Sequence, residues 1–94
     1  VMVFIRVSID SHSEKEAKKF EEEVSALEHV VACYSIGGDA DFLLQVVSPD
    51  LDTYAEFSMS IIRRLPGIKE MQSMFVLEPI QNIFYAKVAL KRLN

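Results

Sequence analysis

Five consecutive residues near the middle of the chain, Gly37-Gly38-Asp39-Ala40-Asp41, have the side-chain types best suited to binding a small charged molecule. Aspartate and carbonyl oxygens accept hydrogen bonds from an amino group, backbone N–H groups donate to a carboxylate, and glycines let the backbone approach a ligand closely. An ordinary turn has the same composition, with the aspartates capping and solvating it. The residues alone leave both interpretations open.

The side chains that enzymes use as nucleophiles or bases are few and scattered. Cys33 is the single cysteine, and we expect it to be a buried structural side chain. His12 and His29 stand at the two ends of a predicted helix without the spacing of a zinc site, and His29 is expected to interact with the helix dipole. We therefore predict no enzymatic activity, no catalytic residue, no metal and no cofactor.

Length, composition and charge restrict the class of protein. The 94 residues, 50% of them hydrophobic, fit one domain over residues 1–94, with 81–94 as a C-terminal extension. The formal net charge of -4 disfavours direct binding of nucleic acid. No stretch approaches the roughly 20 apolar residues of a membrane span, and a lone cysteine requires no oxidising compartment. We expect a cytoplasmic protein that makes no membrane contact.

Hydrophobic periodicity predicts the elements that position the central turn. Residues 1–9 alternate with a period of two, which predicts a strand. Ser13 and Glu16 indicate a capping box at the start of an amphipathic helix, whose apolar face includes Phe20 and Leu27. Two β-branched and aromatic segments, 30–36 and 42–47, flank the turn and predict a hairpin.

The second half of the chain predicts one more helix and one more strand. Ser48 as N-cap and Pro49 at the first helical position predict a helix that continues to Pro66-Gly67. Its shared apolar face is expected to contain Leu51, Tyr54, Phe57, Ile61, Ile62 and Leu65. Residues 68–77 predict the last strand, and residues 82–94 fit either a strand or a helix.

This order of elements predicts an α+β, ferredoxin-like βαββαβ sandwich, in which two helices cover one face of an antiparallel four-stranded sheet. Neither face of the predicted sheet is purely polar. The apolar residues that lead to this conclusion are Met2, Phe4, Leu43, Val47, Met74 and Phe75. A large apolar sheet face in water is an association site, so we expect dimerisation through the sheet. The alternative is scattered surface apolar residues that the C-terminal tail covers.

The segment Cys33 to Val46, CYSIGGDADFLLQV, resembles the signature of the Lrp/AsnC ligand-binding (RAM) domain. That signature is a Cys-Tyr pair, a Gly-Asp-x-Asp-aromatic turn and a Leu-x-Val strand. Leu51, Tyr54 and Phe57, together with residues 65–68 and 73–77, are similar to the family's second helix and final strand. The resemblance covers roughly residues 1–80. Gly37 and Met71 stand where the family often has threonine, which predicts fewer polar ligand contacts.

The resemblance implies a non-enzymatic domain of transcriptional regulation that senses an amino acid and oligomerises. A free amino acid would bind between dimers, four of which commonly form an octamer, and would alter the assembly. The effector-binding residues that the resemblance implies are Gly38, Asp39, Ala40, Asp41, Ser73 and Met74. Because residues 1–9 already predict the first strand, we expect the family's usual helix-turn-helix domain to be absent from this sequence. We therefore expect a stand-alone or excised domain, with full-length Lrp/AsnC relatives as candidate partners.

Two other classes of protein stay open. An ACT-like amino-acid-binding regulatory domain has the same topology, although its glycine-rich turn usually lies between the first strand and the first helix. This chain has no glycine at that junction, residues 10–13. A small dimeric αβ-barrel enzyme would need a polar catalytic group inside an apolar pocket, and no acid-base pair stands out in the sequence.

Overall fold

The computed structural model describes residues 1–10, 13–65 and 67–81. Its elements, in chain order, are β1 (Met2–Ile9), α1 (Glu14–Ser25), β2 (Val30–Ser35), β3 (Phe42–Val47), α2 (Leu51–Ser60), the short 3-10 helix η1 (Ile62–Arg64) and β4 (Ile68–Phe75). The expectations for His12, Pro66 and the segment 82–94 lie outside the described residues. Within the described ranges, no helix has the length and hydrophobicity needed to cross a membrane.

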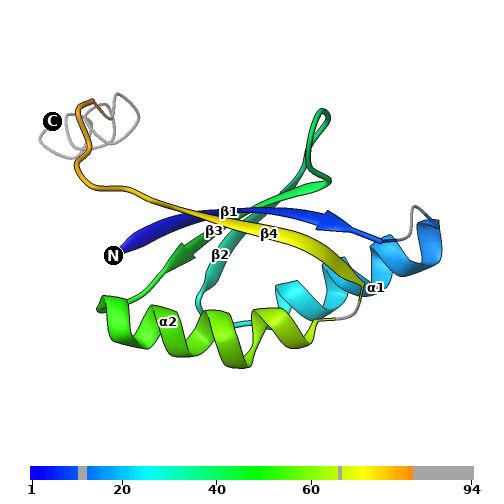
Figure 1. Ribbon diagram of the computed structural model, residues 1–94, viewed down its shortest axis with the longest axis horizontal. Helices are drawn as coiled ribbons and strands as arrows, with labels where there is room; N and C mark the ends of the chain where they lie inside the picture. The colour runs from blue at the N-terminus through cyan, green and yellow to red at the C-terminus, as the bar shows by residue number, and fades with distance from the viewer. Residues whose placement is uncertain (11–12, 66, 82–94) are drawn as a thin grey trace, which may run out of the picture.

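The four strands form one sheet in the order β2-β3-β1-β4, and every neighbouring pair is antiparallel. Both helices lie on the same side of this sheet (Figure 1). The predicted α+β, ferredoxin-like arrangement is therefore confirmed. The loop between β2 and β3 rises on the side away from the helices (Figure 1).

The core lies between the sheet and the two helices. Val3, Ile5 and Val7 of β1 are fully buried, as the alternation of that strand predicts. From α1, Phe20 is 1% exposed and stacks on Phe42, with 4.8 Å between the ring centroids. Because β1 is central and contributes every second residue to this layer, it positions both neighbouring strands.

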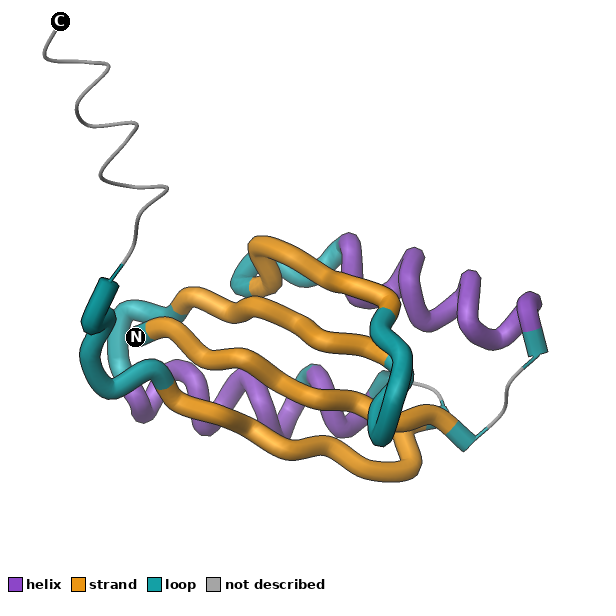
Figure 2. The backbone as a smooth tube through the Cα atoms, turned by 90° about the horizontal axis from the view of Figure 1, so that it is seen from above, coloured by secondary structure: helices purple, strands orange, loops and turns teal. Residues whose placement is uncertain are grey.

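The face of the sheet that is turned away from the helices, here called the open face, is seen directly in Figure 2. Strand pairing divides it into a mainly apolar half and a mainly polar half, although Gln45 lies opposite Phe4 and Leu43 lies opposite Arg6. In the apolar half, Met2 lies opposite Val47, and Phe4 lies opposite Met74. In the polar half, Arg6 pairs with Gln72, and Ser8 pairs with Glu70. Met2, Val47 and Met74 are exposed in this chain, and dimerisation through their face stays a prediction.

The second helix departs from the prediction at its start. Its N-cap is Asp50, whose Oδ1 accepts a hydrogen bond from the Thr53 backbone N–H at 2.7 Å, and this bond lowers the pKa of the Asp50 carboxyl. Ser48, the predicted cap, directly follows the last residue of β3, and its backbone continues the pairing at that end of the sheet. Its backbone N–H donates to the Val1 carbonyl, and its own carbonyl accepts from the amino group of Val1.

The second helix also ends earlier than predicted, at Ser60, where the 3-10 turn η1 takes over. The chain continues from Ile62 to Arg64 with the tighter period of a 3-10 helix. Leu51 and Ile61, which we expected on the buried face, are 59% and 38% exposed, whereas Ile62 is fully buried. The last strand likewise ends at Phe75 instead of residue 77.

Two further predictions about single residues were wrong. The first helix ends at Ser25, so His29 lies beyond it and packs edge-on against the Phe57 ring instead of facing the helix dipole. Cys33 is exposed, because it lies on the edge strand β2. Neighbouring atoms still partly desolvate its Sγ and, together with the Glu21 carboxylate, raise the pKa of the Cys33 thiol. A raised pKa disfavours the thiolate, so Cys33 is a poor nucleophile.

Candidate functional site

The loop between β2 and β3 is held at its base by two backbone hydrogen bonds. The Ile36 N–H donates to the Asp41 carbonyl at 3.0 Å, which closes the loop. The Asp41 N–H donates to the Val7 carbonyl at 2.9 Å, which attaches the loop to the central strand. Gly38 adopts a φ of +100°, a conformation that side-chain-bearing residues rarely accept. The backbone conformation of the loop therefore requires glycine at position 38.

Replacing Gly38 with alanine is expected to destabilise the domain by about 1–2 kcal/mol, because the new Cβ is strained at a positive φ even though no atom lies within 4 Å of it. Gly37→Ala is the matched control, since Gly37 has open space around it and is not among the positive-φ glycines. Chemical denaturation of both variants tests the difference. Equal free energies of unfolding would show that the loop does not need glycine at position 38.

The two aspartates of the loop have different surroundings. Asp41 Oδ2 accepts a hydrogen bond from the Ile9 backbone N–H at 2.9 Å, so this carboxylate fastens the loop to the end of β1. The Asp39 side chain is 92% exposed, and its Oδ2 lies 3.6 Å from Nη2 of Arg6. Asp41 therefore has a structural partner, whereas the Asp39 carboxylate is accessible to a ligand.

A cleft of about 550 Å³ lies where the loop meets the polar half of the open face. Figure 2 shows the loop across the ends of the neighbouring strands. Side chains from β1, the loop and β4 line this cleft, namely Arg6, Ser8, Asp39, Ala40, Glu70, Met71 and Gln72. Arg6 Nη1 donates to Gln72 Oε1 at 3.5 Å, and Ser8 Oγ donates to the Asp39 carbonyl at 3.4 Å. The first of these contacts joins β1 to β4, and the second joins β1 to the loop.

The structure brings together part of the predicted set of site residues. Asp39 and Ala40 line the cleft, while Gly38 and Asp41 shape and attach the loop. Ser73 and Met74 point to opposite faces of β4 and do not line this cleft. Ser73 Oγ faces the helices, 2.6 Å from the Tyr54 hydroxyl oxygen, whereas Met74 lies opposite Phe4 on the open face. Assignment of these six residues to an effector site stays a prediction.

Sequence reasoning singled out Met71 but missed the other strand residues of the cleft, which are Arg6, Ser8, Glu70 and Gln72. Arg6 carried a signal, since it is the one charged residue in the alternating segment of β1. Glu70 and Gln72 carried none, because their place beside Ser8 and Arg6 depends on the pairing register of two strands far apart in the chain.

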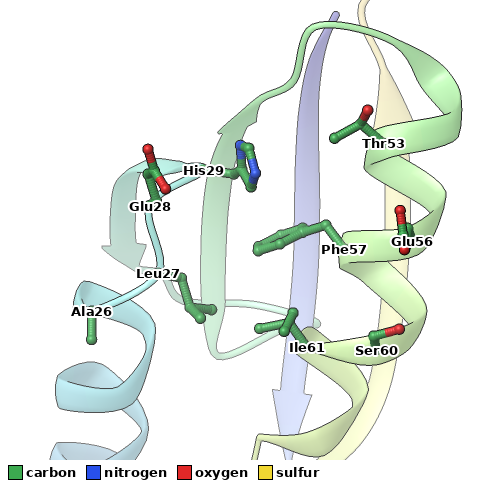
Figure 3. A pocket seen from close by; sticks show the side chains of 9 residues that line it. All are labelled: Ala26, Leu27, Glu28, His29, Thr53, Glu56, Phe57, Ser60 and Ile61. Atoms are coloured by element: carbon green, nitrogen blue, oxygen red, sulfur yellow. The ribbon is translucent and has the colours of Figure 1, made fainter.

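A second cleft, of about 410 Å³, lies on the helix side between α2 and the segment that links α1 to β2 (Figure 3). Leu27, Phe57 and Ile61 give it an apolar lining, and Glu28 and Glu56 add carboxylates. None of its lining residues belongs to the β2–β3 loop. This cleft is therefore separate from the predicted site.

Comparisons with known proteins give this geometry a family context. The sequence model of the Lrp/AsnC ligand binding domain matches residues 2–82. The Bkd operon transcriptional regulator of Pseudomonas aeruginosa is 32% identical over 78 residues, which are 83% of this chain and 51% of that protein. The chain spans about half the length of the curated relatives it matches.

Two solved structures share the fold and part of the sequence. A transcriptional regulator of Neisseria meningitidis in complex with L-Met is 30% identical, with a TM-score of 0.78 over 86% of this chain and 52% of that one. An AsnC family transcriptional regulator of Agrobacterium tumefaciens is 37% identical, with a TM-score of 0.77 and the same coverage of both chains. The chain belongs to the family of Lrp/AsnC ligand-binding domains, which are parts of transcriptional regulators.

Proposed function

We propose that this domain binds a free amino acid as effector beside the β2–β3 loop. The observation that carries the proposal is the cleft in which Asp39 and Ala40 of the loop meet polar side chains of β1 and β4. Its volume of about 550 Å³ lies within the usual range of small-molecule sites. The relative from Neisseria meningitidis was solved with L-Met, which supports an amino acid as the ligand class.

We also propose that the domain forms homodimers through the open face and assembles further, as an octamer of four dimers. The apolar half of that face supports this, because Met2, Val47 and Met74 expose between 36% and 43% of their surface in the single chain. Exposed apolar surface gathered on one sheet face favours association with a second copy. The cleft adjoins this half along β1 and β4.

The mechanism is a coupled equilibrium and includes no covalent step. An amino acid that binds between dimers contacts one assembly state better than another, and shifts the population by that difference in affinity. In a complete regulator the shift would rearrange attached DNA-binding domains. A domain without them would act by assembling with full-length relatives.

The test is thermal unfolding of the domain with each of the twenty amino acids, combined with light scattering on the same samples. At ten times its Kd, a ligand stabilises the folded state by about 1.4 kcal/mol, which raises the Tm of a domain of this size by about 5–10 °C. We expect one or a few amino acids to do so and to change the assembled mass. If no amino acid raises the Tm at millimolar concentration, effector binding is wrong and the domain serves assembly alone.

A further inference from the structure

The polar half of the open face places one cationic side chain beside two carboxylates in the same cleft. We infer that Arg6 anchors the α-carboxylate of the effector, while Asp39 and Glu70 receive its α-ammonium group. This inference rests on the proposed function. It names the residue that recognises the α-carboxylate of the ligand. It also restricts the ligands to amino acids whose α-carboxylate and α-ammonium groups are both free.

Arg6 is positioned for this role by the central strand. It lies on β1 between Leu43 of β3 and Gln72 of β4, on the face that also carries the loop. Its guanidinium has one contact on each side, 3.5 Å from Nη1 to Gln72 Oε1 and 3.6 Å from Nη2 to Asp39 Oδ2. The side chain is 36% exposed, so it is oriented by its neighbours and still reachable from the cleft.

The ion pair between Arg6 and Asp39 is weak enough for a ligand to open. It is a single contact of 3.6 Å, and the carboxylate side is 92% exposed. Exposed pairs of this kind contribute little to stability, whereas a carboxylate that meets a guanidinium through both oxygens forms two parallel, charge-assisted bonds. A ligand carboxylate can therefore replace Asp39 at Arg6 and gain the second bond.

The carboxylates of the cleft then match the other charge of the ligand. The α-ammonium and α-carboxylate groups of an amino acid share one carbon atom, so an ammonium stays close to any carboxylate held at Arg6. Asp39, released from Arg6, and Glu70, which lies opposite Ser8 on β4, line the same cleft. Asp41 is not needed for this role, because its Oδ2 already accepts from the Ile9 N–H.

The decisive experiment titrates the intact domain with L-methionine and with L-methioninamide, in wild type and in Arg6→Gln. Any other amino acid that raises the Tm is titrated with its own amide in the same way. Loss of the charge-assisted pair is expected to weaken binding of the free acid by roughly 10- to 100-fold in Arg6→Gln. The amide should bind wild type more weakly by a similar factor, and Arg6→Gln should no longer distinguish acid from amide.

Controls separate this role from a structural one. Arg63→Gln makes the same change at an exposed arginine of η1 outside the cleft, and should leave the affinity unchanged. Arg6→Lys keeps the charge without the planar fork, and should give an intermediate loss. If the acid and the amide bind wild type equally, or if Arg6→Gln weakens both equally, the inference is overturned and the proposed function stands. If no free amino acid binds wild type, both are wrong.

Discussion

Replacing Met74 with lysine is expected to convert the proposed homodimer into monomers. Met74 is 36% exposed at the apolar half of the open face, so a lysine at this position can reach solvent and lowers the folding stability of the single chain only a little. In a sheet-to-sheet dimer the same ammonium would be desolvated, and two-fold symmetry would place one from each copy in the interface. We expect the Kd of the dimer to rise at least about 100-fold in sedimentation equilibrium.

Met59→Lys is the matched control for this prediction. Met59 is 69% exposed on α2, on the helix side of the molecule, and its replacement should leave the dimer intact. If the Met74 variant keeps the wild-type Kd while it remains folded, the open face is not the interface between copies. If both variants dissociate, the interface includes the helix side.

The division of the open face bears on how a ligand would influence assembly. Along β1, Phe4 faces the apolar half and Arg6 the cleft, two positions apart on the same side of the sheet. A change at Arg6 therefore occurs next to the surface that we expect a second copy to cover. Such closeness allows a ligand to favour one arrangement of copies over another without any large movement inside the domain.

Much of the fold could be predicted, because its elements obey local periodicity. Alternation in β1 correctly predicts that Val3, Ile5 and Val7 face the core. The second helix was harder, because Ser48 and Asp50 are both good caps and local sequence does not decide between them. Tertiary contacts decide: the backbone of Ser48 pairs with the backbone of Val1 beside β1, and Asp50 begins the helix.

The candidate site could be predicted only in part, for a reason that lies in strand pairing. The loop residues Asp39 and Ala40 are adjacent in sequence, and the family resemblance implies a site there, whereas their composition alone also fits an ordinary turn. Arg6 and Gln72 meet only because β1 and β4 pair in one particular register, which a single strand's pattern does not specify. Ser73 and Met74 were expected together from the family resemblance, but consecutive strand residues point to opposite faces.

Replacing Phe20 with alanine is expected to cost about 3–5 kcal/mol of the free energy of unfolding, because a ring that is 1% exposed would leave a cavity between α1 and the sheet. This is a large share of the roughly 5–15 kcal/mol that a domain has. The variant should also weaken amino-acid binding. Phe20 stacks on Phe42, the first residue of β3 after the loop, so losing the ring loosens the loop's attachment.

Urea denaturation and the amino-acid titration measure the two effects of this variant. Glu22→Ala is the control, since it truncates an exposed side chain of the same helix and should change the free energy of unfolding by less than about 0.5 kcal/mol. A loss below about 1 kcal/mol in Phe20→Ala would contradict the packing of α1 on β3. Normal stability with weakened binding would show that Phe20 acts on the ligand by another route. The opposite result, lower stability with unchanged affinity in the folded fraction, would show that the hydrogen bonds of Asp41 to Ile36, Val7 and Ile9 suffice to hold the loop.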